Sequence, residues 1–153
     1  MTFRTWLYRG GRPRGAARLA DRLTAALASR GIAPAHLVTL EVRGRRSGRT
    51  VSVPLVTAGV DGERYLVSML GEDVHWVRNV RAAGGRVVLR HGGRERVRLH
   101  EVPPERRAPV LRAYLARATH ARDHVPVDVD APSEAFAAIA DRHPVFRVAG
   151  RDR

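Results

Sequence analysis

The chain has no cysteine, no lysine and no glutamine, and it contains one asparagine among 153 residues. Without cysteine, disulfide bonds, thiolate metal ligands and cysteine nucleophiles are excluded, which suits a reducing compartment. No stretch approaches the roughly 20 apolar residues that a membrane helix requires. The N-terminal residues also lack the apolar core of a signal peptide. We therefore expect a soluble, cytoplasmic protein.

Acidic residues are scarce relative to basic ones. The 28 basic residues, all arginine, face 15 acidic residues, so the formal net charge is +13. The codon bias of a GC-rich genome accounts for arginine in place of lysine, but not for the basic surplus. That surplus predicts attraction to a polyanion, such as nucleic acid, a phospholipid surface or a phosphorylated small molecule. The arginines are spread over the whole chain and aromatic residues make up 5%, so we expect no nucleic-acid binding.

Hydrophobic periodicity divides the first half of the chain into one helix and three strands. A basic, irregular segment, 1–14, precedes apolar residues at helical spacing over 16–27. From residue 36 the period changes to two, which predicts strands separated by glycine-containing turns. These strands cover 36–43, 50–57 and 64–69. Pro54 cannot donate to a strand ladder, so an edge or a bulge is expected there.

The second half contains more helix and one hairpin. Asp73 is expected to cap a helix over 74–82. The remaining predicted elements are a hairpin (86–90 and 95–101), helices over 103–118 and 133–142, a polar loop over 119–130 and a strand over 144–149. The absence of repeats and linkers favours a single domain, 1–153. About six mostly antiparallel strands without regular βαβ alternation predict an α+β fold, a split β-barrel with helices packed outside.

The turn Gly44-Arg45-Arg46-Ser47-Gly48 is the first candidate binding site. Two glycines let the backbone approach a ligand, and successive N–H groups can point at an anion. The arginines and the Ser47 hydroxyl add donors that suit phosphate oxygens. The alternative is an ordinary solvated hairpin tip.

A second candidate is the segment Ser68-Met69-Leu70-Gly71 with the helix that follows it. A strand that ends in glycine before a helix can hold an anion or the edge of a polar ring. Trp76 and Asn79 lie three residues apart, hence on one helix face, where Trp could stack on a ring. The alternative for Trp76 is core packing. Asn79 needs hydrogen-bond partners beside an apolar face.

The histidines offer little chemistry. His120, Asp123 and His124 have a spacing that could hold zinc on a helix, but Pro126 and the polar loop argue against that helix. We therefore expect no metal site. No Ser-His-Asp arrangement, phosphate-binding loop or dinucleotide fingerprint can be recognised.

In order and spacing, these motifs resemble the deazaflavin-dependent nitroreductase family. The resemblance rests on Gly44 to Gly48, Pro54-Leu55, Ser68 to Gly71 and Trp76 to Asn79, and it extends over about 39–115. It implies a split β-barrel that binds coenzyme F-420, an 8-hydroxy-5-deazaflavin with a phosphate and a polyglutamate tail. It also implies hydride transfer from the reduced cofactor to a quinone, an enone or a nitroaromatic acceptor.

The resemblance assigns roles to particular residues. Arg45, Arg46, Ser47 and Gly48 would hold the phosphate, and the arginine surplus would attract the anionic tail. Pro54 and Leu55 would lie along the ring system, with Ser68, Met69, Leu70 and Gly71 near it, and Trp76 and Asn79 as the pocket wall. Tyr114 is a weak candidate for a catalytic residue. The best-known relatives have Arg where Val51 stands, Lys where Leu70 stands, and tyrosines in the region matching 119–130.

Other interpretations remain open. A non-catalytic split barrel could carry another ligand, such as a flavin, haem, a bilin or a fatty acid, because fold does not determine function. Flavin mononucleotide is the weaker alternative as cofactor. The protein could form a homodimer, and the basic N-terminal region, with Leu19, Leu23 and Leu27 on one side, could contact a membrane peripherally.

Overall fold

A computed structural model describes residues 22, 25, 34–118, 125 and 127–151. The six strands, in chain order, are β1 (Leu37–Arg43), β2 (Thr50–Val60), β3 (Glu63–Val67), β4 (Arg86–Arg90), β5 (Arg94–Glu101) and β6 (Val145–Arg151). The helices are α3 (His75–Ala82), α4 (Ala108–Arg117) and α5 (Ser133–Ile139), with single 3-10 turns at Pro34–His36, Pro104–Arg106 and Ala140–Arg142. The predicted segments 1–14 and 16–27 lie outside the described residues, apart from residues 22 and 25.

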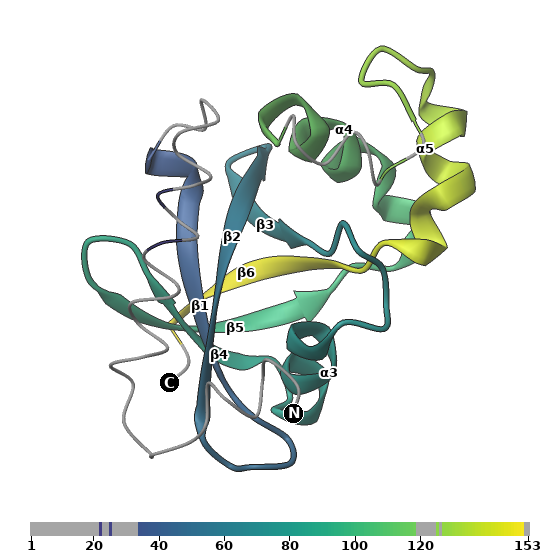
Figure 1. Ribbon diagram of the computed structural model, residues 1–153. Helices are drawn as coiled ribbons and strands as arrows, with labels where there is room; N and C mark the ends of the chain where they lie inside the picture. The colour runs from purple at the N-terminus through teal and green to yellow at the C-terminus, as the bar shows by residue number, and fades with distance from the viewer. Residues whose placement is uncertain (1–21, 23–24, 26–33, 119–124, 126, 152–153) are drawn as a thin grey trace.

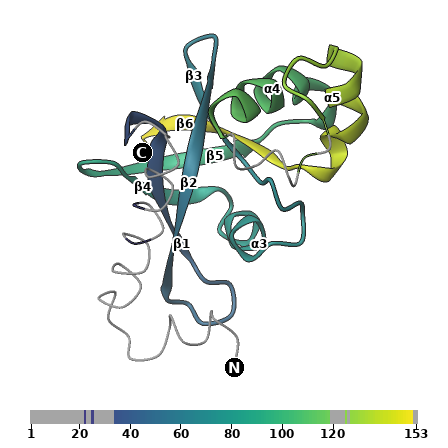
Figure 2. The ribbon, with the colours of Figure 1, turned by 45° about the horizontal axis from the view of Figure 1, so that its top comes forward.

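The strands form a closed antiparallel barrel in the order β1-β2-β3-β6-β5-β4, with β4 pairing back to β1. This confirms the predicted split-barrel fold of six antiparallel strands. Figure 1 shows α4 and α5 together at one end of the barrel and α3 at the other. The turned view in Figure 2 separates the two helical ends in the same way.

Two groups of buried apolar side chains pack the helices against the barrel. The first, here called the α3 cluster, joins Val77 and Val80 of α3 to strand residues such as Leu40, Leu66 and Phe146. The second, the α4–α5 cluster, joins the two later helices to other faces of the strands. Its largest members are Leu37, Val110, Leu111, Tyr114, Leu115 and Phe136. The side chains that the helical spacing placed on the buried side of α4 are buried in the structure.

Two glycines fix the connection from α3 to β4. Gly84 and Gly85 both have positive φ, as predicted for residues that end a helix. Gly85 donates to the Val80 carbonyl at 2.9 Å and accepts from the Leu99 N–H at 2.7 Å. A Cβ atom at Gly85 would collide with the Leu99 carbonyl oxygen. Only glycine therefore satisfies this close approach of α3 to β5.

Several predicted boundaries were wrong. β2 continues to Val60, and β3 ends at Val67 rather than residue 69. The helix predicted over 103–118 is a 3-10 turn followed by α4, because Pro109 has no N–H to donate to the carbonyl of residue 105. The last predicted helix ends at Ile139 and continues as a 3-10 turn.

Asp73 does not cap α3. The N-cap is Val74, which makes no side-chain cap hydrogen bond. The Asp73 carboxylate instead forms an ion pair with Arg78. Asp73 is exposed, so its charge contributes through that pair and not by closing the first turn of the helix.

Pro54 lies on an edge of β2, as its missing N–H predicted. It is paired with Thr39 of β1. β2 pairs with β3 only from Thr57 onward. Among the described residues, no strand pairs with the other side of β2 at Pro54.

Candidate functional site

The turn between β1 and β2 is closed by its own backbone. Gly44 donates to the Arg49 carbonyl at 2.7 Å, and Gly48, with φ of +72°, donates to the Gly44 carbonyl at 2.9 Å. The Ser47 hydroxyl oxygen accepts from the Arg49 N–H at 3.2 Å. The N–H groups of Arg46 and Ser47 donate to no acceptor among the described residues. These two exposed donors can therefore point at an anion.

Helix α3 fixes one arginine of this turn. The Asn79 amide oxygen accepts from the Arg45 backbone N–H at 3.1 Å and from Arg45 Nη1 at 2.9 Å. Asn79 is wholly buried. The two sequence-predicted motifs, 44–48 and 76–79, are thus in direct contact, although 34 residues separate the bonded pair.

An open hollow of about 680 Å³ lies over the turn. Its lining combines the turn residues with the C-terminal end of α3 and the first residue of β4: Arg43, Gly44, Arg45, Arg46, Ser47, Gly48, Ala82, Ala83 and Arg86. We call it the turn hollow. Four of its nine lining residues are arginines and none is acidic, so its charge favours an anionic ligand.

The Arg43 side chain lies over the turn. A Cβ atom built at Gly48 would be 3.5 Å from Arg43 Nη2 and 3.8 Å from Arg43 Nε. The missing side chain of Gly48 therefore leaves room for this guanidinium beside the exposed N–H groups of the turn. Guanidinium forks and backbone N–H groups are the donors that phosphate groups take in proteins. The donor set of the turn hollow thus fits a phosphate.

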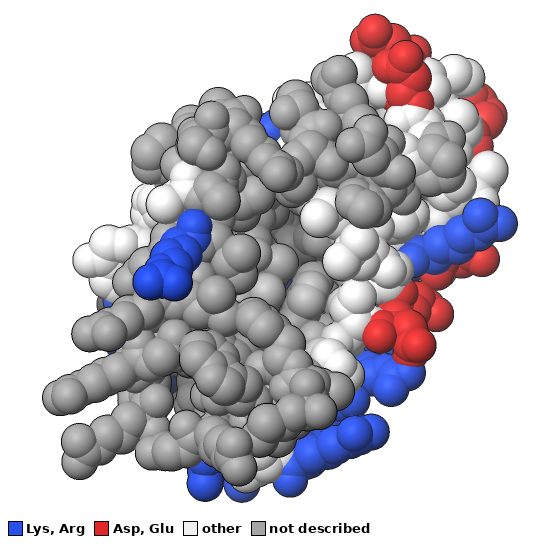
Figure 3. All heavy atoms as spheres, in the orientation of Figure 1, with Lys and Arg blue, Asp and Glu red and all other residues white. Residues whose placement is uncertain are grey.

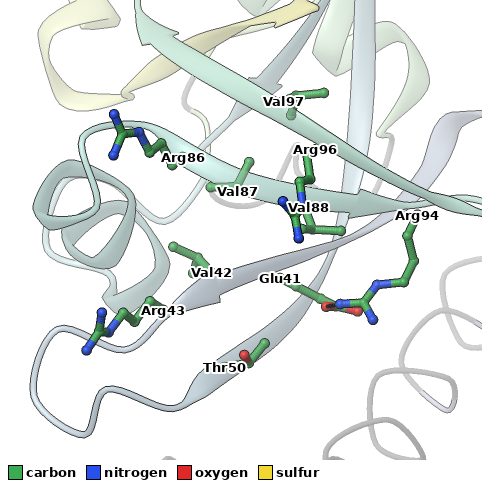
Figure 4. A pocket seen from close by; sticks show the side chains of 10 residues that line it. All are labelled: Glu41, Val42, Arg43, Thr50, Arg86, Val87, Val88, Arg94, Arg96 and Val97. Carbon is green, nitrogen blue, oxygen red and sulfur yellow. Dashed lines mark hydrogen bonds and ion pairs between the residues drawn. The ribbon is translucent and has the colours of Figure 1, made fainter. Parts of the chain in front are cut away.

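A second hollow, of about 310 Å³, continues from the first along the outside of the barrel. The two share Arg43 and Arg86. Figure 4 shows Arg43 and Arg86 extending to one side and Arg96 of β5 beside Val88 of β4, while Arg94 reaches toward Glu41. Glu41 is bonded by both Arg90 and Arg94, at 2.5 and 2.8 Å. We call this second hollow the arginine groove.

The ion pairs divide the arginines of the groove into two kinds. Arg90 and Arg94 share the carboxylate of Glu41, so part of their charge is compensated. Arg43 and Arg96 form no ion pair with any described residue. The space-filling view in Figure 3 shows arginines along its lower edge, with acidic side chains beside them at the lower right and others at the top right. The charges of Arg43 and Arg96 favour an anion in the arginine groove.

The Ser68–Gly71 segment follows β3 and leads into α3. Ser68 is buried and donates through its hydroxyl to the Gly71 carbonyl at 2.5 Å. The buried ring of His143 lies 3.1 Å from the Ser68 carbonyl through Nδ1. Leu70, by contrast, is 61% exposed and is the one exposed large hydrophobic side chain of the described residues. The segment is held at Ser68 and presents Leu70 to solvent.

The other residues predicted to hold a ring system are partly buried. Pro54 and Leu55 of β2 and Trp76 of α3 all keep some exposure. The Trp76 ring lies 5.7 Å from Phe146, at an interplanar angle of 56°. Leu55 and Trp76 both pack against the α3 cluster. None of these residues lines the turn hollow, and neither does the Ser68–Gly71 segment. Their contact with a cofactor therefore stays a prediction.

Tyr114 lies apart from the turn hollow. It is 4% exposed and belongs to the α4–α5 cluster. This burial raises the pKa of the Tyr114 phenol well above its ordinary value. A phenol held neutral in this way keeps its proton at any physiological pH. Its role as a catalytic residue stays a prediction.

Sequence reasoning missed two residues of the turn hollow, Arg43 and Arg86. Each follows or precedes a glycine at the end of a strand, which was the available signal. In a chain with 28 arginines that signal was too weak to separate them from the rest. His120, Asp123 and His124, whose spacing was judged not to predict a zinc site, lie outside the described residues. Within the described part, no three potential metal ligands cluster.

The closed barrel of six antiparallel strands, with helices packed outside it, places this chain among the split-barrel proteins. The chain belongs to the F420H(2)-dependent quinone reductase family, whose model matches residues 15–132. It is therefore an oxidoreductase that depends on coenzyme F-420. A comparison with curated proteins found no match.

Solved structures confirm the fold. A structure described as a domain-swapped dimer has 18% identity and a TM-score of 0.54, with 86% of this chain and 95% of that chain covered. A conserved hypothetical protein from Mycobacterium tuberculosis has 17% identity and a TM-score of 0.54, covering 94% and 85%. A NimC/NimA family protein from Clostridium acetobutylicum has 12% identity and a TM-score of 0.52, covering 88% and 82%. At these identities the likeness extends to the fold alone.

Proposed function

We propose that this chain transfers a hydride from reduced coenzyme F-420 to a quinone, with the cofactor's phosphate held in the turn hollow. The observation that carries the phosphate site is the turn itself. It presents two N–H donors without acceptors among the described residues, the Arg43 guanidinium over Gly48, and Arg45 held by Asn79. The family description supports a quinone as acceptor. Enones and nitroaromatics are the other acceptors that the resemblance suggests.

The cofactor, when bound, supplies the hydride, and this chain's residues bind and orient it. Arg45, Arg46, Ser47 and Gly48 would anchor the phosphate. The arginine groove, which continues from the same hollow, has the charge to attract the anionic tail. The resemblance assigns contact with the ring to Pro54, Leu55, Trp76 and the Ser68–Gly71 segment, and we propose the same contacts here. The resemblance places Asn79 in the same wall, where its buried amide bonds to Arg45 of the turn.

The alternative proposal is a carrier that binds its ligand without turnover. The two are separated by mixing the protein anaerobically with reduced coenzyme F-420 and menadione, and by following reappearance of the oxidised cofactor's absorbance. Multiple turnovers support the reductase. Stoichiometric binding without oxidation, with a nitroaromatic and an enone also inert, would support the carrier instead.

A homodimer and membrane contact through the basic N-terminus stay predictions. In the described part of the chain, no helix is long and apolar enough to cross a membrane.

The phosphate site is tested by replacing Arg45 and Arg46 together with Ala. Losing two charge-assisted donors should raise the Kd for coenzyme F-420 about 100-fold, at roughly 1.4 kcal/mol per donor. Titration calorimetry measures the Kd, and Arg106→Ala, an exposed arginine next to α4, is the matched control. If the double variant binds as tightly as the natural chain, the turn is not the phosphate site.

A further inference from the structure

His143 is a buried polar side chain in the connection that leads into β6. It is 6% exposed and follows the 3-10 turn Ala140–Arg142. Its ring nitrogen Nδ1 lies 3.1 Å from the Ser68 carbonyl oxygen, across 75 residues of chain. A carbonyl oxygen can only accept, so Nδ1 must carry the proton and donate it to this bond. His143 therefore supplies the Ser68 carbonyl with a buried donor.

The backbone of the same connection holds both ends of the Ser68–Gly71 segment. The Ser68 N–H donates to the Pro144 carbonyl at 2.9 Å. Gly71, with φ of +97°, lies so close to the connection that a Cβ atom built on it would be 3.4 Å from the Arg142 carbonyl oxygen. The Ser68 hydroxyl donates to the Gly71 carbonyl at 2.5 Å, which ties one end of the segment to the other. Both ends are thus seated on the connection into β6.

These anchors fix a segment whose most prominent side chain is not buried. Leu70 lies between them and is 61% exposed, so folding gains little apolar burial from holding it in one place. Irregular, exposed connections are otherwise the mobile parts of a fold. A connection that is fixed by a buried imidazole is a preformed surface. Such a surface favours a ligand that lies on it, because binding then requires less ordering.

We infer that His143 is a positioning residue: by donating to the Ser68 carbonyl, it holds the Ser68–Gly71 segment ready for the deazaflavin ring of the cofactor. The inference deepens the proposed function and rests on it, since it requires that the segment contact the ring. His143 itself touches no part of the cofactor and moves no proton. The segment and the turn at 44–48 then hold different parts of one ligand, the ring and the phosphate.

The decisive pair of variants is His143→Gln and His143→Asn. An asparagine amide nitrogen takes nearly the place of Nδ1 and can still donate to the Ser68 carbonyl, whereas a glutamine amide nitrogen lies one bond farther out. The Kd for coenzyme F-420 should rise about fivefold in His143→Gln, the effect of one lost hydrogen bond, and stay within about twofold of the natural value in His143→Asn. Titration calorimetry measures both values. His100→Gln, which changes an exposed histidine of β5, is the matched control and should leave the Kd unchanged.

A smaller ligand shows which part of the cofactor the segment serves. The 8-hydroxy-5-deazaflavin that lacks the phosphate and the tail should lose affinity in His143→Gln by the same factor as coenzyme F-420. It should bind the Arg45→Ala, Arg46→Ala double variant as it binds the natural chain, because it has no phosphate to lose. A purely structural role of His143 would lower the thermal midpoint in both His143 variants and leave the Kd unchanged in the folded protein.

Failure of this inference and failure of the proposed function give different results. If the natural chain does not bind coenzyme F-420, the proposed function fails and the inference with it. If the natural chain binds the cofactor and His143→Gln binds it as tightly, the inference alone is overturned. Equal weakening in His143→Asn and His143→Gln would also overturn it, because the donor at Nδ1 would then not be what matters. If the glutamine variant does not fold, His143→Leu, which is apolar and has no donor, takes its place with the same expected rise in Kd.

Discussion

Arg107, at one end of the barrel, and the turn arginines Arg43 and Arg46, at the other, differ in how much of their charge is used inside the fold. At the α4–α5 end, Arg107 is 3% exposed and every direction of its guanidinium meets an acceptor. It donates to the carbonyls of Val102, Ala140 and His143 and to the Glu101 carboxylate, at 2.7–3.4 Å. At the α3 end, Arg43 and Arg46 form no ion pair with any described residue.

This difference distinguishes arginines that stabilise the fold from arginines that can bind a ligand. The composition of the chain does not make that distinction. An arginine whose charge and donors are consumed inside the fold stabilises the fold. An arginine that forms no ion pair inside the fold keeps its charge available to an anionic ligand. The following changes test this separation.

The largest effect is expected for Arg107→Met. Methionine fills much of the same volume but leaves three buried carbonyls without this donor and Glu101 without a buried partner. The free energy of unfolding should fall by about 3 kcal/mol, measured by urea denaturation. The Kd for coenzyme F-420 should stay the same at temperatures where the variant is folded. Arg106→Met, at an exposed neighbouring position, should change stability by less than about 0.5 kcal/mol. Loss of affinity in folded Arg107→Met would mean that the two ends are not separate.

A smaller effect with a defined pH dependence is expected for Glu101→Gln. Glu101 accepts from Arg81 at 2.8 Å and from Arg107 at 3.1 Å, and the Arg81 hydrogen bond lowers the pKa of Glu101. The ionised carboxylate therefore stabilises the protein above its ordinary pKa, and this contribution is lost as the pH falls through the lowered value in the folded chain. Because Glu101 is one-third exposed, the loss at pH 7 should be about 1 kcal/mol.

Denaturation of the natural chain and of Glu101→Gln across the acidic range measures that dependence. The two curves of stability against pH should converge at low pH and diverge toward neutrality. Glu105→Gln, an exposed carboxylate on the same connection, should run parallel to the natural chain. A gap between Glu101→Gln and the natural chain that persists at low pH would assign the loss to packing instead of charge.

The separation of the two ends also explains what the sequence could and could not predict. The strands and the turn at 44–48 follow from local alternation and glycine placement, so their existence was predictable. Closure of the barrel depends on pairing β6 with β3 and β5, which joins segments about eighty residues apart in the first case and has no local signal. The Asp73 cap failed because Arg78, one turn along the helix, competes for the carboxylate.

Within the site, the role of the single asparagine was predictable from the sequence, whereas the roles of individual arginines were not. Asn79 stood out as the single asparagine, and the structure shows the partner that it required, Arg45. Arg43 and Arg86 could not be distinguished from the other arginines, because what sets them apart is the hollow that they both line. That property depends on three-dimensional neighbours and cannot be read along the chain.

The smallest effect is expected at Leu70, a position near the proposed cofactor where this chain has no positive charge. The best-known members of the deazaflavin-dependent nitroreductase family, which the sequence resembles, have lysine at the position of Leu70. The Leu70 side chain is 61% exposed. Leu70→Lys would add a solvated cation to the Ser68–Gly71 segment at little cost in stability, because no buried apolar surface is lost. An exposed charge pair contributes about 0.5–1 kcal/mol, so the Kd for coenzyme F-420 should fall about threefold at low salt and return toward the natural value at high salt.

Leu70→Gln, similar in size but neutral, is the control and should leave the Kd unchanged. If glutamine tightens binding as much as lysine does, the leucine side chain obstructs the ligand, and charge at this position is irrelevant. If neither changes the Kd, the segment lies too far from the anionic part of the cofactor, and binding charge is confined to the turn hollow and the arginine groove.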